Sequence, residues 1–207
     1  MTEPGLDRTP SFIDARRSVR SFDTAPVSRA TLDMLISAAC TAPAPHHSRP
    51  WRFVIIDSAE GKESLAVGMA ARWRQDLEAD GIDDLRIVEL VSASHQKLIS
   101  APTLILGCLT WDGLDRYPDE ARKRAEWGMA LLSLGAAVEN LMLAASAVGL
   151  ASCWIAAPIF CPEEARDALG LAVDWLPHAL VTVGNQDPKY SAPPRRDIDL
   201  STLRVHR

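Results

Sequence analysis

The chain has 207 residues, of which 47% are hydrophobic, so one well-filled domain spanning residues 1–207 is expected and disorder is not. The formal net charge of -5 argues against a nucleic-acid-binding protein, because such a surface would need a basic face.

Cysteine usage and the start of the chain bear on the compartment. The four cysteines have neither C-x-x-C spacing nor histidines at zinc-finger distances, which predicts neither a disulfide framework nor a metal site. This usage fits a reducing, cytoplasmic location. The first residues contain no apolar signal segment. The longest apolar segment, 127–150, is broken by Glu139 and Asn140, so no membrane span is expected.

The first third of the chain predicts two helices and a strand. After a loose arm at residues 1–10, Ser11–Arg17 is expected to form a short helix with Ser11 as its cap. A second helix begins after Ser28, which serves as N-cap, carries apolar residues at helical spacing, and ends at Pro43. The run Trp51–Asp57 is apolar and rich in β-branched residues, which predicts a strand.

The middle of the chain predicts two surface helices and a buried strand. The helices are expected over Leu65–Glu78 and Leu85–Ile99. Ala101–Thr110 is continuously apolar rather than alternating, which predicts a strand in the middle of a sheet that is covered on both faces. The polar connection Trp111–Arg124 has the length of a substrate-facing lid, with a plain surface loop as the alternative.

The longest predicted helix, Glu126–Val148, is apolar on nearly all sides and ends before Gly149. Such a helix must be buried. In a chain of this size we expect burial against a second copy of the subunit, with a path through the core of one subunit as the alternative.

The last third predicts two further strands, Ala151–Ile159 and His178–Gly184, separated by a short helix over Pro162–Leu169. Residues 187–207 are expected to form an extended C-terminal tail. Strands that alternate with helices indicate an α+β or α/β sandwich. The glycine patterns of phosphate-binding loops and dinucleotide-binding folds are absent, so a Rossmann site is not expected.

Two polar clusters stand out as candidate binding segments. Arg16, Arg17 and Arg20 lie beside Ser18 and Ser21, and these groups can hold a phosphate by charge-assisted hydrogen bonds. The alternative is that the arginines only complement a helix dipole. The proline-rich segment Ala42–Trp51 displays two imidazoles, a hydroxyl and a guanidinium on a stiff backbone. It suits a planar polar ligand with an acidic group, or it is a solvated turn.

The order of these segments resembles the nitroreductase family of FMN-dependent oxidoreductases. The resemblance rests on Arg16-Arg17-Ser18-Val19-Arg20-Ser21-Phe22, on Ala-Pro-x-x-x-x-Ser-Arg-Pro-Trp51-Arg-Phe, and on Gly149-Leu-Ala-Ser-Cys-Trp154-Ile, and it extends from about Phe12 to Arg196. It implies an α+β fold in which a central, mostly antiparallel sheet forms a three-layer α/β/α sandwich. It also implies an intertwined homodimer with two FMN sites at the subunit interface.

The resemblance also implies which residues contact the cofactor. The first motif and a late arginine match positions that hold the flavin phosphate, and the segment after Cys153 matches the lining of the isoalloxazine. His47 replaces the usual asparagine and Arg49 the usual glutamine, so the hydrogen bonds around the ring are not expected to be standard. The implied FMN-binding residues are Arg16, Arg17, Ser18, Arg20, His47, Ser48, Arg49, Pro50, Trp154, Ile155, Ala156, Ala157, Arg195 and Arg196.

The proline-rich loop is also similar to that of the flavin domain at the C-terminus of FbiB proteins, which act in biosynthesis of the deazaflavin coenzyme F-420. This similarity implies reduction of a dehydro precursor of the deazaflavin, with His46 or His47 as the proton donor to the acceptor. Alternatively, the two histidines only hydrogen-bond the flavin or the backbone.

Two other functions remain open. One is a broad nitro or quinone reductase with NAD(P)H as electron donor, and the other is a non-catalytic flavin- or deazaflavin-binding protein.

Overall fold

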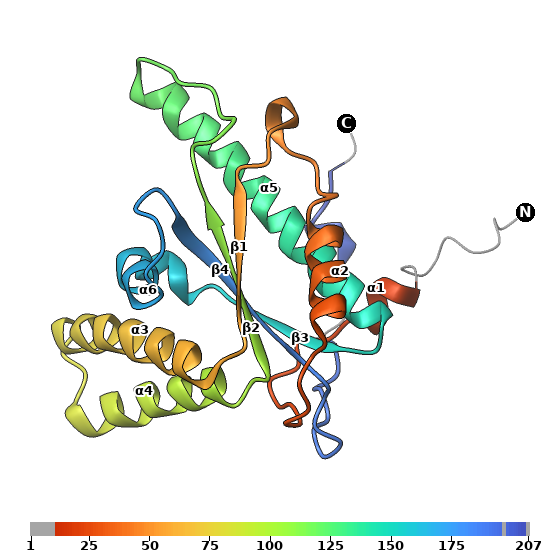
Figure 1. Ribbon diagram of the computed structural model, residues 1–207, viewed down its shortest axis with the longest axis vertical. Coiled ribbons are helices and arrows are strands. Elements are labelled where there is room, and N and C mark those ends of the chain that lie inside the picture. Colours follow the sequence, from red (N-terminus) through yellow and green to blue (C-terminus); the bar gives the residue numbers. More distant parts are fainter. Residues whose placement is uncertain (1–10, 196–197, 206–207) are drawn as a thin grey trace, which may run out of the picture.

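The computed structural model describes residues 11–195 and 198–205. The predicted arm at residues 1–10 and the predicted ligand Arg196 lie outside the described residues. Figure 1 shows a central sheet with helices on both of its sides and the long helix α5 running diagonally across the molecule.

The sheet has four strands in the order β1 (Trp51–Ile56), β2 (Thr103–Leu109), β4 (Leu176–Gly184) and β3 (Ala151–Ile155), and every neighbouring pair is antiparallel. All residues of β2 are buried, which confirms the prediction of a central strand covered on both faces. Successive residues of β2 contribute to opposite cores, since side chains alternate along a strand.

Helices α2 (Arg29–Ala39) and α5 (Glu120–Ala147) cover one face of the sheet, with the short α1 (Ser11–Ala15) beside α5. Helices α3 (Ala59–Ala79), α4 (Asp84–Ile99) and α6 (Pro162–Ala168) cover the other face. The α+β class and its three-layer arrangement are therefore confirmed. The short helices η1 (Pro45–His47), η2 (Ala157–Phe160) and η3 (Leu200–Thr202) lie in connections.

Two helices begin earlier than their apolar patterns predict. The side chain of Ser58 accepts a hydrogen bond from the backbone N–H of Gly61 at 3.0 Å, so α3 begins at Ala59 rather than at Leu65. Asp119 likewise accepts from the N–H of Arg122 at 2.9 Å, so α5 begins at Glu120. Consequently the connection after β2 is shorter than the predicted Trp111–Arg124.

Three elements end earlier than predicted. Helix α2 ends at Ala39 rather than at Pro43, with Cys40 as its C-cap. The first helix ends at Ala15 rather than Arg17, because the next residues extend along β3, where the N–H of Val19 donates to the carbonyl of Ser152 at 3.0 Å. Strand β3 ends at Ile155 rather than Ile159, because Ala156 (φ -85°, ψ 0°) leaves the extended conformation and starts η2.

Helix α5 has two kinds of apolar surface. One side, which includes Ala130, Leu134 and Leu141, is buried against the sheet and α2. The other side exposes Leu132 at 77% and Met129 at 39%. The helix has the length and hydropathy of a membrane span, but its packed side accounts for much of that composition. The alternative prediction, burial of this helix in the core of one subunit, is therefore correct for one side of α5 only.

The end of β4 is tightly packed. A Cβ on Gly184 would lie 2.7 Å from Cγ and 2.8 Å from Cδ of Pro102, closer than real Cβ atoms approach other atoms. Glycine is therefore required for this close contact between the sheet and the chain entering β2.

Candidate functional site

The arginine-rich segment lies along the outer edge of β3. Ser18 forms a parallel bridge with Ser152, two residues before Trp154. The sheet edge therefore brings the two predicted flavin-binding segments, Arg16–Arg20 and Trp154–Ala157, next to each other, although more than 130 residues separate them in the chain. This proximity arises from the pairing of distant segments in the tertiary structure, and no local sequence signal indicates it.

The C-terminal tail reaches the same place. Nη2 of Arg195 donates to the carbonyl oxygen of Arg16 at 2.6 Å, and it lies 3.3 Å from the carbonyl oxygens of Ile13 and Asp14. Arg17 donates in turn to the carbonyl of Pro193. The structure thus brings together the early and late arginines of the predicted phosphate site. Part of their charge compensates the carbonyl end of α1.

A groove of about 230 Å³ continues from this cluster along β3 and α4. Two cations, Arg20 and Lys97, line it, and no carboxylate of the described residues lies within ion-pair distance of either. The pKa of the Cys153 thiol in the groove is raised by burial, while the positive charges of Arg20, Arg16 and Lys97 act to lower it. The groove therefore combines positive charge with the exposed indole of Trp154. Its lining is Arg20, Phe22, Ser94, Lys97, Leu98, Cys153, Trp154, Ile155 and Thr182.

Lys97 and Ser94 line the groove but were not predicted as site residues. They lie near the end of α4, which read only as a polar surface helix. One signal was present: Lys97 is a basic residue in the last turn of a helix directly before a buried strand. A side chain at that position is expected near the end of the sheet where the strand begins.

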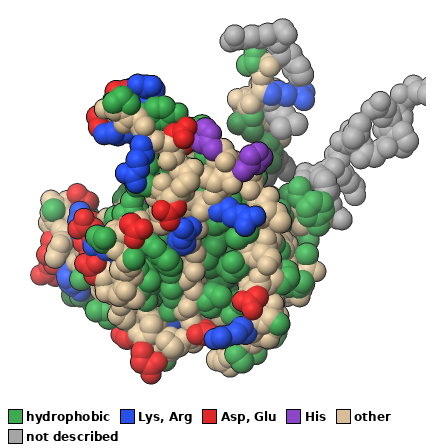
Figure 2. Space-filling model, turned by 45° about the horizontal axis from the view of Figure 1, so that its top comes forward, with side chains coloured by type: hydrophobic (Ala, Val, Ile, Leu, Met, Phe, Trp, Pro, Cys, Tyr) green, Lys and Arg blue, Asp and Glu red, His purple; other side chains and the backbone are tan. Residues whose placement is uncertain are grey.

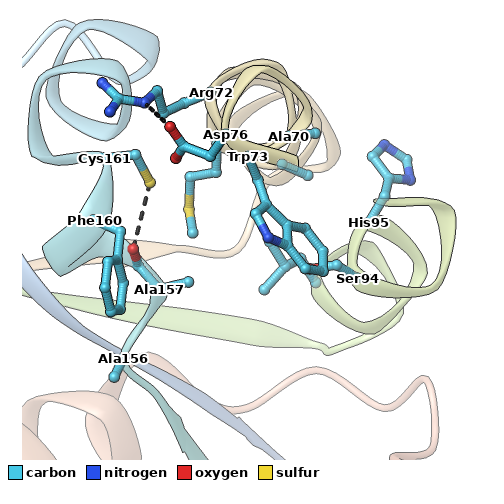
Figure 3. Close-up of a pocket in the computed structure, with 13 residues that line it drawn as sticks. Ala70, Arg72, Trp73, Asp76, Ser94, His95, Ala156, Ala157, Phe160 and Cys161 are labelled. Atoms are coloured by element: carbon cyan, nitrogen blue, oxygen red, sulfur yellow. Dashed lines mark hydrogen bonds and ion pairs between the residues drawn. The ribbon is translucent and has the colours of Figure 1, made fainter. Parts of the chain in front are cut away.

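A larger cavity of about 490 Å³ begins where the groove ends, since Ser94 and Leu98 line both. It contains the predicted flavin-lining residues Ala156 and Ala157, and Figure 3 shows Trp73 of α3 and Phe160 of η2 on opposite sides of it. The size and the largely apolar lining are those of a small-molecule pocket. No local sequence pattern predicts this cavity, because its walls come from three separate segments.

The charged groups at the rim of this cavity are already paired. Nε of Arg72 lies 2.9 Å from Oδ1 of Asp76, and its Nη1 lies 3.7 Å from a carboxylate oxygen of Glu164. His95 lies 3.0 Å from a carboxylate oxygen of Glu63. Among the described residues, the rim therefore offers no free cation to an anionic ligand, and the cavity suits an uncharged aromatic molecule.

The predicted binding loop has an unusual backbone. His46 and His47 both have positive φ, at 55° and 53°, a left-handed conformation that costs an L-residue about 1–2 kcal/mol. Nε2 of His46 lies 3.4 Å from Oε1 of Glu126 and 3.6 Å from Oδ2 of Asp115. His47, Ser48 and Arg49 line a cavity of about 400 Å³. Pro50, also in the loop, is buried.

Within one chain this loop is remote from the arginine cluster. His46 contacts α5 at Glu126, whereas Nε of Arg16 pairs with Oε1 of Glu139 at 2.9 Å, thirteen residues further along the same helix. At 1.5 Å per residue the two contact points lie about 20 Å apart. Figure 1 shows η1 and α1 near opposite ends of α5. The structure therefore does not bring the histidines to the groove of the same chain.

The geometry defines an α+β protein with a basic groove at a sheet edge, a form suited to a planar ligand with a phosphate. The family model "Nitroreductase family" matches residues 13–185. The chain therefore belongs to the nitroreductase family, a class of FMN-dependent oxidoreductases, and the prediction of an enzyme is confirmed.

Relatives of this chain are described with different activities. Iodotyrosine deiodinase of Drosophila melanogaster is 28% identical over 208 residues, covering 97% of this chain and 70% of that protein. A BluB-like flavoprotein from Clostridium difficile superposes with a TM-score of 0.75 at 22% identity, covering 95% of this chain and 97% of that one. A nitroreductase with bound FMN from Bacteroides fragilis gives a TM-score of 0.72 at 22% identity over the same shares.

Proposed function

We propose that FMN binds in the groove along β3, with its phosphate at Arg16–Arg20 and Arg195 and its ring system beside Trp154–Ala157. The observation that carries this proposal is the pair of cations, Arg20 and Lys97, that face the groove without a carboxylate partner among the described residues. A phosphate and a polar ring edge would offset this charge by charge-assisted hydrogen bonds.

Bound FMN would supply hydride transfer, and the protein orients and shields the reaction. In this chain, Arg16, Arg17 and Ser18 would hold the phosphate end, while Trp154 and Ile155 would support the ring from the sheet edge. NADH or NADPH is the proposed electron donor.

We further propose a cytoplasmic homodimer in which each subunit completes the site of the other. The loop bearing His47 and Arg49 lies about 20 Å along α5 from the arginine cluster of its own chain. A second copy packed on the exposed apolar side of α5, at Met129 and Leu132, would bury that surface. That arrangement would bring the histidine loop of one subunit to the flavin of the other.

For the acceptor, we propose first a dehydro precursor of a deazaflavin. The loop His46–Arg49 supports it, because imidazole and guanidinium groups suit an acidic acceptor, and His46 or His47 could donate the proton that accompanies the hydride.

A second candidate is a broad nitro or quinone reductase. The cavity between Trp73 and Phe160 supports it, because the lining is apolar and the rim cation Arg72 is already paired. A neutral aromatic ring fits that environment better than a polyanion does.

The first test is a visible absorption spectrum of the purified protein, followed by identification of the released flavin and by sedimentation. Bound FMN and a dimer are expected. A folded protein that takes up no added FMN would refute the proposed function, and a compact monomer would refute the shared site.

Turnover with NADH or NADPH then separates the acceptors. Consumption of a dehydro deazaflavin precursor supports the first candidate, and steady-state reduction of nitroarenes or quinones without binding of deazaflavins supports the second. Tight flavin binding without turnover under any of these conditions would leave a non-catalytic flavin-binding protein.

A further inference from the structure

The η1 turn holds two adjacent histidines in a conformation that glycine or asparagine adopts more readily. Both His46 and His47 have positive φ. Figure 2, in which the top of Figure 1 comes forward, shows histidine side chains at the surface with acidic and basic side chains around them. Because these backbone angles are strained, contacts outside the turn must hold them.

The main contact comes from a buried carboxylate of α5. Glu126 is 1% exposed, and its Oε1 accepts a hydrogen bond from the backbone N–H of Asp115 at 3.1 Å. The same oxygen lies 3.4 Å from Nε2 of His46, whereas Oε2 has no hydrogen-bond partner among the described residues. A buried carboxylate with so few partners is unfavourable. Contact with the imidazole of His46 therefore stabilises this carboxylate.

The rest of the loop is fixed from the other side. A Cβ on Gly113 would lie 3.0 Å from Cβ of Ser48, so the connection after β2 packs directly on the loop. The backbone N–H of Thr110 donates to the carbonyl of Pro50 at 2.8 Å. With Ser48 and Pro50 held in this way, the position of His46 decides the path of His47, the one residue between His46 and Ser48.

We propose that Glu126 is a positioning residue that anchors His46 and thereby sets the direction in which the loop presents His47. The side chain of His47 lines the cavity beside the loop and is exposed. The identity of its ligand, flavin or acceptor, rests on the proposed function. The anchoring itself rests only on contacts within this chain.

A double-mutant cycle tests the anchor. Glu126→Gln removes the charge at nearly constant shape, His46→Gln removes the imidazole, and the double variant removes both. Two sets of measurements are made. The first is the urea unfolding equilibrium without flavin, and the second is the dissociation constant of added FMN together with KM and kcat for the acceptor. Glu120→Gln is the matched control, because Glu120 is an exposed residue of α5 that pairs only with Lys123 among the described residues.

We expect each single variant to weaken FMN or acceptor binding about tenfold, and the double variant to weaken it no further. In the unfolding equilibrium, the effect of the double variant should differ about fivefold from the product of the two single effects. Additive effects in the cycle would overturn the proposal, as would a Glu126→Gln variant with altered stability and unaltered ligand binding.

The two proposals fail in different ways. If the unmodified protein takes up no FMN, the proposed function fails, and the unfolding cycle still decides the anchor: coupling supports it and additivity overturns it. If the unmodified protein binds FMN but none of the variants changes ligand binding, the anchor fails and the proposed function stands.

Discussion

Replacement of Lys97 tests the flavin site most directly. Lys97→Gln removes one of the two cations in the groove and keeps a polar side chain of similar length. A hydrogen bond to a charged group contributes about 1.5–3 kcal/mol. The dissociation constant of FMN should therefore rise about 10- to 100-fold.

The same substitution should leave the flavin-free protein almost unchanged. Lys97 is exposed, and within the described part of the chain its ammonium forms no ion pair. The free energy of unfolding without FMN should shift by less than about 0.5 kcal/mol, as at other surface positions. Loss of repulsion from Arg20 would act in the stabilising direction.

The assay is titration of FMN by quenching of its fluorescence at low ionic strength, together with urea unfolding of the flavin-free protein. Lys123→Gln is the control, because Lys123 pairs with Glu120 at 2.7 Å on the exposed first turn of α5. The control should bind FMN normally. If Lys97→Gln also binds FMN with unaltered affinity, the groove is not the flavin site.

Three further predictions concern packing and titration. Gly184→Ala should destabilise the protein by about 1–3 kcal/mol in urea unfolding, because the new methyl group overlaps a proline ring; a change near zero would show that the ring moves freely. Burial lowers the pKa of His178, so the unfolded state takes up its proton first and stability should fall as pH drops below the ordinary histidine value of about 6.5. His178→Gln should reduce that slope, and equal slopes would contradict the assignment. Burial raises the pKa of Cys108 to about 12, so in the native protein at pH 8 iodoacetamide should label the half-buried Cys40 and not Cys108 until urea is added. Equal native labelling, measured by mass spectrometry, would refute this.

Local sequence determined most elements of the fold. The N-cap at Ser28 predicts the start of α2, and the continuous apolar run through Ile105 predicts the central buried strand. Both signals act within a few residues, through a cap hydrogen bond or through side-chain periodicity, so they can be read directly. Errors arose at helix starts such as Ala59 and Glu120, where a polar cap lies outside the apolar pattern.

The sequence also supplied the types of residue in the candidate site, through the arginine motif and the loop with His46 and His47. Only the tertiary structure decided which of them meet. Pairing of Ser18 with β3 brings the arginines to Trp154, and α4 adds Lys97, while the length of α5 separates the histidines from that groove. Such proximity depends on strand order, register and helix packing, and contacts between distant segments leave no periodic mark in either segment.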